Sequence, residues 1–235
     1  MKLTLLTVAL VSGALAVPAP VSDAEAFPID ELLVSKLTPE EHAISKRQYS
    51  SSTYNQLTDG TACRPISLIY ARGTGQQGNV GDAAAVGPLF FNQIASRVGG
   101  TSQLAIQGVT YSASVSGFLQ GGDPTGSTTM TNLIGSTASR CPNTKIVLSG
   151  YSQGAQLVHN AAVRTSAANA ARVAAVVVFG DPKRGQSFGS IATSKTLTIC
   201  HTGDNICEGG TSITGAHLNY QNDAGTAGAF VAGKV

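Results

Sequence analysis

Five short apolar runs, separated by stretches with helical spacing, are the feature that most constrains the fold of this chain. Each run is rich in Val, Ile and Leu and almost continuously apolar, which is typical of a strand that is covered on both faces. The predicted strands are residues 65–71, 104–109, 145–149, 173–179 and 196–200. The predicted helices are residues 82–98, 127–140, 153–170 and 224–232.

Strands that alternate with helices predict a parallel sheet with right-handed crossovers, in the α/β class, with helices on both faces. Ligands of such sheets bind outside the carboxyl ends of the strands. The residues that directly follow the predicted strands are therefore the first candidates for a functional site.

The N-terminal region has the pattern of a secretory leader. Residues 1–16 combine Lys2, a short apolar segment and small residues before a cleavage point, which predicts a signal peptide too short to span a membrane. Residues 17–47 are acidic, contain several prolines and end in the dibasic pair Lys46-Arg47, which predicts a propeptide removed before Gln48. We therefore expect a secreted, extracellular protein without stable membrane insertion.

The remaining 188 residues, 48–235, are long enough for one domain with a real core. Eleven of the 15 Lys and Arg residues and seven of the 13 Asp and Glu residues lie there, a formal net charge of +4. The basic residues form no cluster and are not interleaved with aromatic residues, so nothing indicates nucleic-acid binding. We expect a single domain that is monomeric.

All four cysteines, Cys63, Cys141, Cys200 and Cys207, lie in this region. An even number behind a secretory signal predicts two disulfides, although four cysteines permit three pairings. The simplest pairing joins Cys200 to Cys207 across a short loop and leaves Cys63 for Cys141. No CxxC pair or histidine spacing indicates zinc, and we expect neither metal nor cofactor.

A short motif, Gly150-Tyr151-Ser152-Gln153-Gly154, joins the third predicted strand to a predicted helix. The pattern G-x-S-x-G is weak by itself, and its alternative is a plain Gly/Ser turn. At a sharp strand-to-helix turn, however, the serine is strained and exposed at the sheet edge, and the helix N-terminus favours developing negative charge. Ser152 is therefore the candidate nucleophile.

A serine nucleophile needs an imidazole base, which in turn needs a carboxylate to orient it. Of four histidines, His42 lies in the removable segment, His159 lies two helical turns beyond Ser152, and His201 directly follows a cysteine. His217, in a loop before the last predicted helix, remains as the candidate base.

Two aspartates directly follow predicted strands. Asp204 lies inside the predicted Cys200–Cys207 loop, whose closure would hold the carboxylate in place. Asp181 precedes a proline, which suits a turn or cap residue. We favour Asp204, and the order Ser152, Asp204, His217 is that of an α/β hydrolase triad.

The chain resembles the fungal cutinase family of secreted serine esterases over nearly all of residues 48–235. The motifs that carry the resemblance are Tyr70-Ala71-Arg72-Gly73-Thr74, the Ser152 motif, residues 200–207, and His217-Leu218-Asn219-Tyr220. The resemblance implies a small lidless α/β hydrolase with a five-stranded parallel sheet, a Ser152-His217-Asp204 triad, and the disulfides Cys63–Cys141 and Cys200–Cys207.

The resemblance also implies an oxyanion hole and a substrate crevice. The oxyanion donors would be the backbone N–H of Gln153 and the backbone N–H and hydroxyl of Thr74, where the family commonly has serine. The β-branch of threonine restricts its rotamer. The residues implied to flank the crevice are Val115, Phe118, Leu119, Ile213 and Leu218, while Thr211, Ser212 and Thr214 make that rim more polar.

We therefore expect hydrolysis of cutin and of short-to-medium-chain, lipid-like esters through an acyl-enzyme. A neighbouring branch of the superfamily deacetylates xylan, but it usually has more cysteines and a polar rim. A secreted, non-catalytic wall- or surface-binding protein is a further alternative. It predicts a broken triad or an exposed aromatic platform, whereas here the triad is complete and there is no Trp.

Overall fold

The five predicted strands pair into one parallel sheet, in the order β2-β1-β3-β4-β5. The computed structural model describes residues 48–235, so the predicted signal peptide and propeptide lie outside the described residues. The strands are β1 (Ile66–Ala71), β2 (Leu104–Gly108), β3 (Lys145–Tyr151), β4 (Val173–Phe179) and β5 (Thr196–Ile199).

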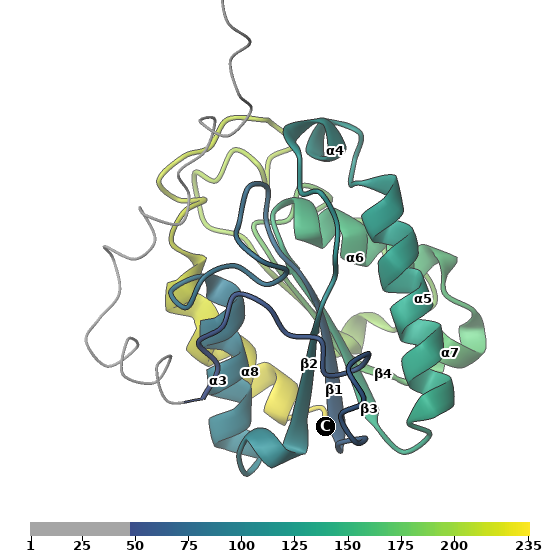
Figure 1. Ribbon diagram of the computed structural model, residues 1–235. Coiled ribbons are helices and arrows are strands. Elements are labelled where there is room, and N and C mark those ends of the chain that lie inside the picture. Colours follow the sequence, from purple (N-terminus) through teal and green to yellow (C-terminus); the bar gives the residue numbers. More distant parts are fainter. Residues whose placement is uncertain (1–47) are drawn as a thin grey trace, which may run out of the picture.

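Helices cover both faces of the sheet, as the apolar strands predict (Figure 1). In β1, Ile69 and Ala71 join the core on one face, and Leu68 and Tyr70 join the core on the other. This division follows from the two-residue period of a strand, which sends successive side chains to opposite faces. The expected α/β class with a five-stranded parallel sheet is confirmed.

The four longest helices divide between the two faces (Figure 1). Helices α3 (Val86–Val98) and α8 (Ala224–Ala232) pack together over one face, and α5 (Pro124–Arg140) and α6 (Gln153–Arg164) cover the other. The shorter elements are α4 (Val115–Leu119), α7 (Ala167–Ala171), and the 3₁₀ helices η2 (Thr101–Gln103), η3 (Thr193–Lys195) and η4 (Tyr220–Asp223).

Capping explains where two helix boundaries differ from the prediction. The helix expected from residue 82 begins at Val86, because the Asp82 carboxylate accepts the N–H groups of Ala84 and Ala85 in a turn. The helix expected from residue 127 begins at Pro124, because Asp123 caps it by accepting the N–H of Gly126 at 2.7 Å.

Two further differences concern short helices. The helix expected over residues 153–170 is divided, because α6 ends at Arg164 and Ser166 caps a new helix, α7, by accepting the N–H of Asn169. Helix α4, which was not predicted, begins after Ser114, whose hydroxyl accepts the N–H of Gly117. A five-residue helix presents too few turns for a periodic pattern.

The structure contains the disulfides Cys63–Cys141 and Cys200–Cys207, which confirms the simplest pairing. The first ties the segment before β1 to the end of α5, across 78 residues of sequence. The second closes the loop that follows β5. Both therefore brace loops rather than the sheet itself.

Helix α6 lies unusually close to the sheet at Gly154. A Cβ atom at this position would lie 2.0 Å from the carbonyl oxygen of Ala71 and 2.7 Å from that of Arg72. Both obstacles are backbone atoms at the end of β1, which cannot rotate away. The close packing that presents Ser152 at the sheet edge therefore requires glycine here.

We predict that Gly154→Ala destabilises the protein by about 1–3 kcal/mol through overpacking. The matched control is Gly225→Ala, at the corresponding second position of α8, where a Cβ would meet nothing within 4 Å. That change should stabilise by up to about 1 kcal/mol, because alanine favours the helix. Urea unfolding of both variants measures the difference, and equal effects would contradict the steric argument.

Candidate active site

Ser152 stands at the turn between β3 and α6 in a strained backbone conformation, with φ 55° and ψ −121°. Within residues 48–235, Ala113 is the only other non-glycine residue with a positive φ. Such conformations cost about 1–3 kcal/mol and persist where the surrounding structure imposes them. The strand-turn-helix context expected for a nucleophile is present.

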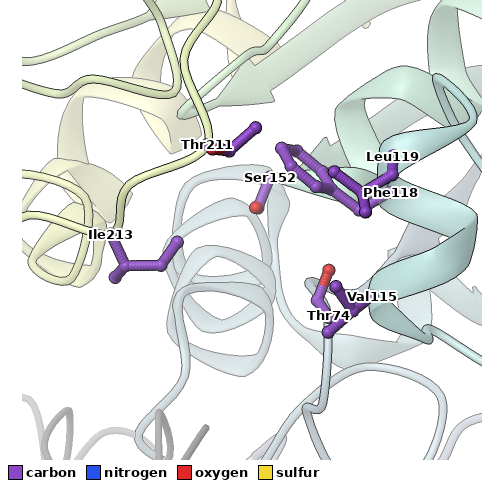
Figure 2. Close-up of a pocket in the computed structure, with 7 residues that line it drawn as sticks. All are labelled: Thr74, Val115, Phe118, Leu119, Ser152, Thr211 and Ile213. Carbon is purple, nitrogen blue, oxygen red and sulfur yellow. The ribbon is translucent and has the colours of Figure 1, made fainter. Parts of the chain in front are cut away.

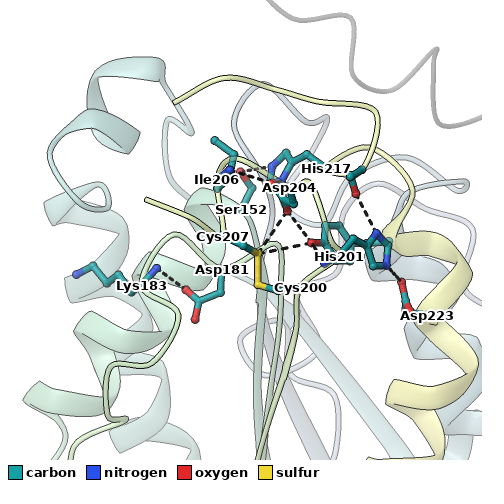
Figure 3. Close-up of a disulfide and its surroundings, with 12 residues drawn as sticks. Ser152, Asp181, Lys183, Cys200, His201, Asp204, Ile206, Cys207, His217 and Asp223 are labelled. Atoms are coloured by element: carbon teal, nitrogen blue, oxygen red, sulfur yellow. Dashed lines mark hydrogen bonds and ion pairs between the residues drawn. A yellow bond between two sulfur atoms is a disulfide. The ribbon is translucent and has the colours of Figure 1, made fainter. Parts of the chain in front are cut away.

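The structure brings the three predicted triad residues together from three separate loops (Figure 3). The Nε2 atom of His217 lies 3.0 Å from Oγ of Ser152, and its Nδ1 lies 2.9 Å from Oδ2 of Asp204. All three side chains are buried, with Ser152 retaining 5% of its exposure. The hydrogen bonds form one continuous chain from carboxylate to hydroxyl.

The partners of His217 determine its tautomer. An ionised carboxylate only accepts hydrogen bonds, so Nδ1 of His217 must donate to Asp204. The lone pair of Nε2 then faces Ser152 and can accept the hydroxyl proton. This is the protonation state that a general base requires.

Asp204 is held by more donors than the histidine alone. The backbone N–H of Ile206 donates to Oδ1 at 2.9 Å, and the hydroxyl of Tyr220 donates to Oδ2 at 2.6 Å. Burial by itself raises the pKa of Asp204, but the hydrogen bonds from His217, Tyr220 and Ile206 outweigh it and hold the pKa below its ordinary value. The carboxylate therefore remains ionised although its side chain is fully buried.

Two residues fit His217 into its position. The Tyr151 hydroxyl donates to the backbone carbonyl of His217 at 2.8 Å, and the two rings stack with centroids 5.1 Å apart. Gly180, at φ 55°, passes beneath the imidazole, where a Cβ would lie 2.8 Å from Cε1. Tyr151 is part of the Ser152 motif, but its contact with a loop 66 residues later could not be inferred from the motif.

The proposed oxyanion donors are linked by a side chain whose role the sequence did not indicate. Nε2 of Gln153 donates to Oγ1 of Thr74 and to the carbonyl of Ser114, both at 2.8 Å. Because Oγ1 of Thr74 accepts this bond, its own hydrogen is left to donate elsewhere. The backbone N–H of Gln153 is the first of α6, where N–H groups have no partner within the helix.

An apolar cavity of about 240 Å³ opens beside Ser152 (Figure 2). Its lining residues are Thr74, Val115, Phe118, Leu119, Ser152, Thr211 and Ile213. Figure 2 shows the Ser152 and Thr74 hydroxyls between the α4 residues on one side and Ile213 on the other. Four of the five expected substrate-binding residues line the cavity; Leu218 does not, and Thr211, expected only to make the rim polar, does.

The rejected candidates His159 and Asp181 form a buried pair of their own. Nε2 of His159 lies 2.9 Å from Oδ2 of Asp181, and its ring stacks on Phe188. Asp181 also accepts the backbone N–H of Lys183, as expected of a turn residue. The pair supports the loop after β4.

Within residues 48–235, no three His, Cys, Asp or Glu side chains gather where they could hold a metal ion. None of the helices in this part of the chain has the length and hydropathy needed to cross a bilayer.

A serine, a histidine and an aspartate linked in this way on a parallel, helix-covered sheet define a serine hydrolase of the α/β class. The sequence model of the family Cutinase matches residues 62–235. A cutinase of Monilinia fructicola is 49% identical over 173 residues, which is 74% of this chain and 84% of that protein. The chain belongs to the cutinase family and is a serine carboxylic-ester hydrolase.

Solved structures agree with this assignment. The Trichoderma reesei cutinase in complex with a C11Y4 phosphonate inhibitor is 40% identical, with a TM-score of 0.71, and the match covers 88% of this chain and 92% of that one. An acetyl xylan esterase is 23% identical with a TM-score of 0.59, over 74% of this chain and 99% of that one. The second likeness shows the shared fold alone.

We predict that Thr74→Val lowers kcat for ester hydrolysis by about 10²–10³-fold, because it removes the hydroxyl donor but keeps the β-branched shape. Thr74→Ser, which keeps the hydroxyl, should stay within about tenfold of the wild type. The measurement is kcat on p-nitrophenyl butyrate. Equal activity of the valine variant and the wild type would remove Thr74 from the oxyanion hole.

Proposed function

We propose that this chain is a secreted cutinase that hydrolyses carboxylic esters, cutin among them, through an acyl-enzyme on Ser152. The observation that carries the proposal is the hydrogen-bonded chain Asp204-His217-Ser152, which ends beside an apolar cavity. The nucleophile and its base are thus within bonding distance at a place where an acyl group can lie.

In the first half of the reaction, Oγ of Ser152 attacks the ester carbonyl while Nε2 of His217 takes the hydroxyl proton. The imidazolium that forms is stabilised by Asp204, which stays ionised because three donors surround it. When the tetrahedral intermediate collapses, the carbon–oxygen bond to the alcohol breaks and His217 returns the proton to the leaving oxygen.

In the second half, water takes the place of the alcohol. His217 accepts a proton from water, whose oxygen attacks the acyl carbon, and the proton then returns to Oγ of Ser152 as the acid leaves. In both halves the oxyanion lies against the backbone N–H of Gln153 and the Thr74 hydroxyl. Because Gln153 fixes Oγ1 of Thr74, this donor is oriented before substrate binds.

The cavity indicates what the acyl part of the substrate resembles. Phe118 and Ile213 offer apolar walls, which suit an aliphatic chain better than an acetyl group on a sugar. Leu119 and Val115 are 65% and 39% exposed at the edge of the cavity, where they can contact a polymer or a lipid-like ester. Thr211 is the polar residue on the side of Ile213.

Secretion and processing form part of the proposal. The two disulfides suit an oxidising compartment. Tyr49 is anchored after the predicted cleavage point by two hydrogen bonds with Asn92 and one to the carbonyl of Leu104, so a chain beginning at Gln48 keeps this anchor. We propose removal of residues 1–16 and 17–47 and a monomeric product.

We predict that Ser152→Ala lowers kcat on p-nitrophenyl butyrate by at least about 10⁴-fold without unfolding the protein. The reason is that Ser152 supplies the hydroxyl in contact with Nε2 of His217, and alanine leaves the base with no nucleophile to activate. Circular dichroism checks the fold. Retention of wild-type turnover by the alanine variant would contradict the role of Ser152.

The substrate class is tested by supplying wild-type protein with emulsified cutin, p-nitrophenyl esters from acetyl to palmitoyl, and acetylated xylan. We expect fatty acid release from cutin and a preference for short-to-medium acyl chains, because the cavity is apolar and small. Activity confined to acetylated xylan would overturn the cutin assignment while leaving the triad in place.

A further inference from the structure

Besides the triad and the His159–Asp181 pair, a third histidine–carboxylate pair lies beside the triad (Figure 3). Nε2 of His201 lies 2.7 Å from Oδ2 of Asp223, and Nδ1 lies 2.9 Å from the backbone carbonyl oxygen of Ala216. The two side chains are partly buried, each with 25% of its exposure. The pair joins the loop after β5 to η4 and to the residue that precedes His217.

Both ring nitrogens of His201 face acceptors. A backbone carbonyl cannot donate, and neither can an ionised carboxylate, so both bonds form only if Nδ1 and Nε2 each carry a hydrogen. Neutral imidazole has one N–H. The geometry is therefore that of a charged His201, unlike His217, which has a hydroxyl donor at one nitrogen.

His201 also contacts the residue that supports the triad carboxylate. Its backbone N–H donates to the Tyr220 hydroxyl at 3.0 Å, and its ring stacks on Tyr220 with centroids 4.1 Å apart and planes 15° apart. The Tyr220 hydroxyl in turn donates to Asp204 at 2.6 Å. Burial and the neighbouring Asp204 raise the pKa of Tyr220, so it remains a neutral donor.

We propose that His201 is a positioning residue for the esterase reaction, and that its charged ring ties the loop that carries His217 to η4. Through Ala216 it fixes the loop that carries His217, and through Tyr220 it fixes the orientation of Asp204. Loss of a ring proton breaks one of the two ring bonds, so the Ala216 loop is no longer tied to Asp223 and turnover falls at alkaline pH, while the backbone N–H bond to Tyr220 remains. The inference rests on the proposed catalytic roles of Ser152, His217 and Asp204.

The charged group in contact with His201, the Asp223 carboxylate, favours the protonated imidazole. Asp223 faces it from η4, Tyr220 lies against its ring, and Asp204 and His217 lie beyond Tyr220 and Ala216. Partial burial lowers the pKa of His201, but the Ala216 carbonyl and the Asp223 carboxylate outweigh it, so the pKa is raised above its ordinary value.

The raised pKa of His201 determines how the tie between Ala216 and Asp223 depends on pH. A raised folded-state pKa means that the contribution of His201 is complete below the unfolded value, about 6.5, and is lost as pH rises through the folded value. The tie is therefore intact at mildly acidic pH, where the imidazolium is populated, and open at alkaline pH.

The test compares His201→Gln and Asp223→Asn with the wild type and with Glu208→Gln. Glu208 is exposed beside Cys207, so the last variant removes one carboxylate near the same loop without touching the pair. We measure kcat and KM on p-nitrophenyl butyrate from about pH 5.5 to about pH 9. Rates are expressed per active site titrated with a p-nitrophenyl phosphonate, which removes the effect of any unfolded fraction.

We expect His201→Gln and Asp223→Asn each to lower kcat about tenfold near pH 6, with KM changed by less than about twofold, because the triad is misplaced but the cavity is intact. As pH rises through the folded-state pKa of His201, the difference should shrink, to less than about twofold once the imidazole is neutral. The double variant should lose no more than either single one, since both break the same tie. Glu208→Gln should follow the wild type at every pH.

Variant kcat within about twofold of the wild type near pH 6 would overturn the proposal, and so would a tenfold loss that is the same at every pH. Should His201→Gln fail to fold, Asp223→Asn carries the test, because it replaces a partly exposed side chain by one of the same shape. An active wild type with unchanged variants refutes only this inference. A wild type that neither reacts with the phosphonate nor hydrolyses the ester refutes the proposed function itself.

Discussion

The close contact between α6 and the end of β1 is the constraint on which the site depends. At Gly154 the helix lies so close to the Ala71 and Arg72 carbonyls that a side chain has no room. The chain therefore turns sharply between β3 and α6, and Ser152 takes up the strained conformation. The same turn makes the N–H of Gln153 the first of α6, directly after Ser152 in the chain. The proposed nucleophile and the proposed oxyanion donor thus both depend on one backbone contact.

The proposed base and its carboxylate come from loops, which need other means of support. Asp204 is held by the disulfide that closes its loop and by three hydrogen-bond donors. His217 is held by Tyr151, and Gly180, which has no Cβ, leaves room for the imidazole. Tyr151 stacks on the imidazole, Tyr220 meets it edge to face, and the two tyrosine rings are in contact with each other. Rigid support of this kind keeps reacting atoms within bonding distance before substrate arrives.

Much of this arrangement could be predicted from local sequence. Continuous apolar runs are enough to predict buried parallel strands, and parallel strands bring their carboxyl ends to one edge, so Ser152 and Asp204 were expected at the same place. The boundaries of α3 and α5 were less predictable, since Asp82 and Asp123 cap turns whose geometry depends on a few hydrogen bonds. Helix α4, which forms a wall of the cavity, is too short to have a periodic signal.

The sequence by itself determined the class of fold, the family, and the candidate nucleophile, base and carboxylate, because each of these depends on residue type and chain order. Only the tertiary structure decided that Gln153 orients Thr74, that Tyr220 donates to Asp204, that Leu218 lies outside the cavity, and that His201 pairs with Asp223. These are contacts between loops, whose paths follow from packing rather than from periodicity, so no pattern along the chain could indicate them.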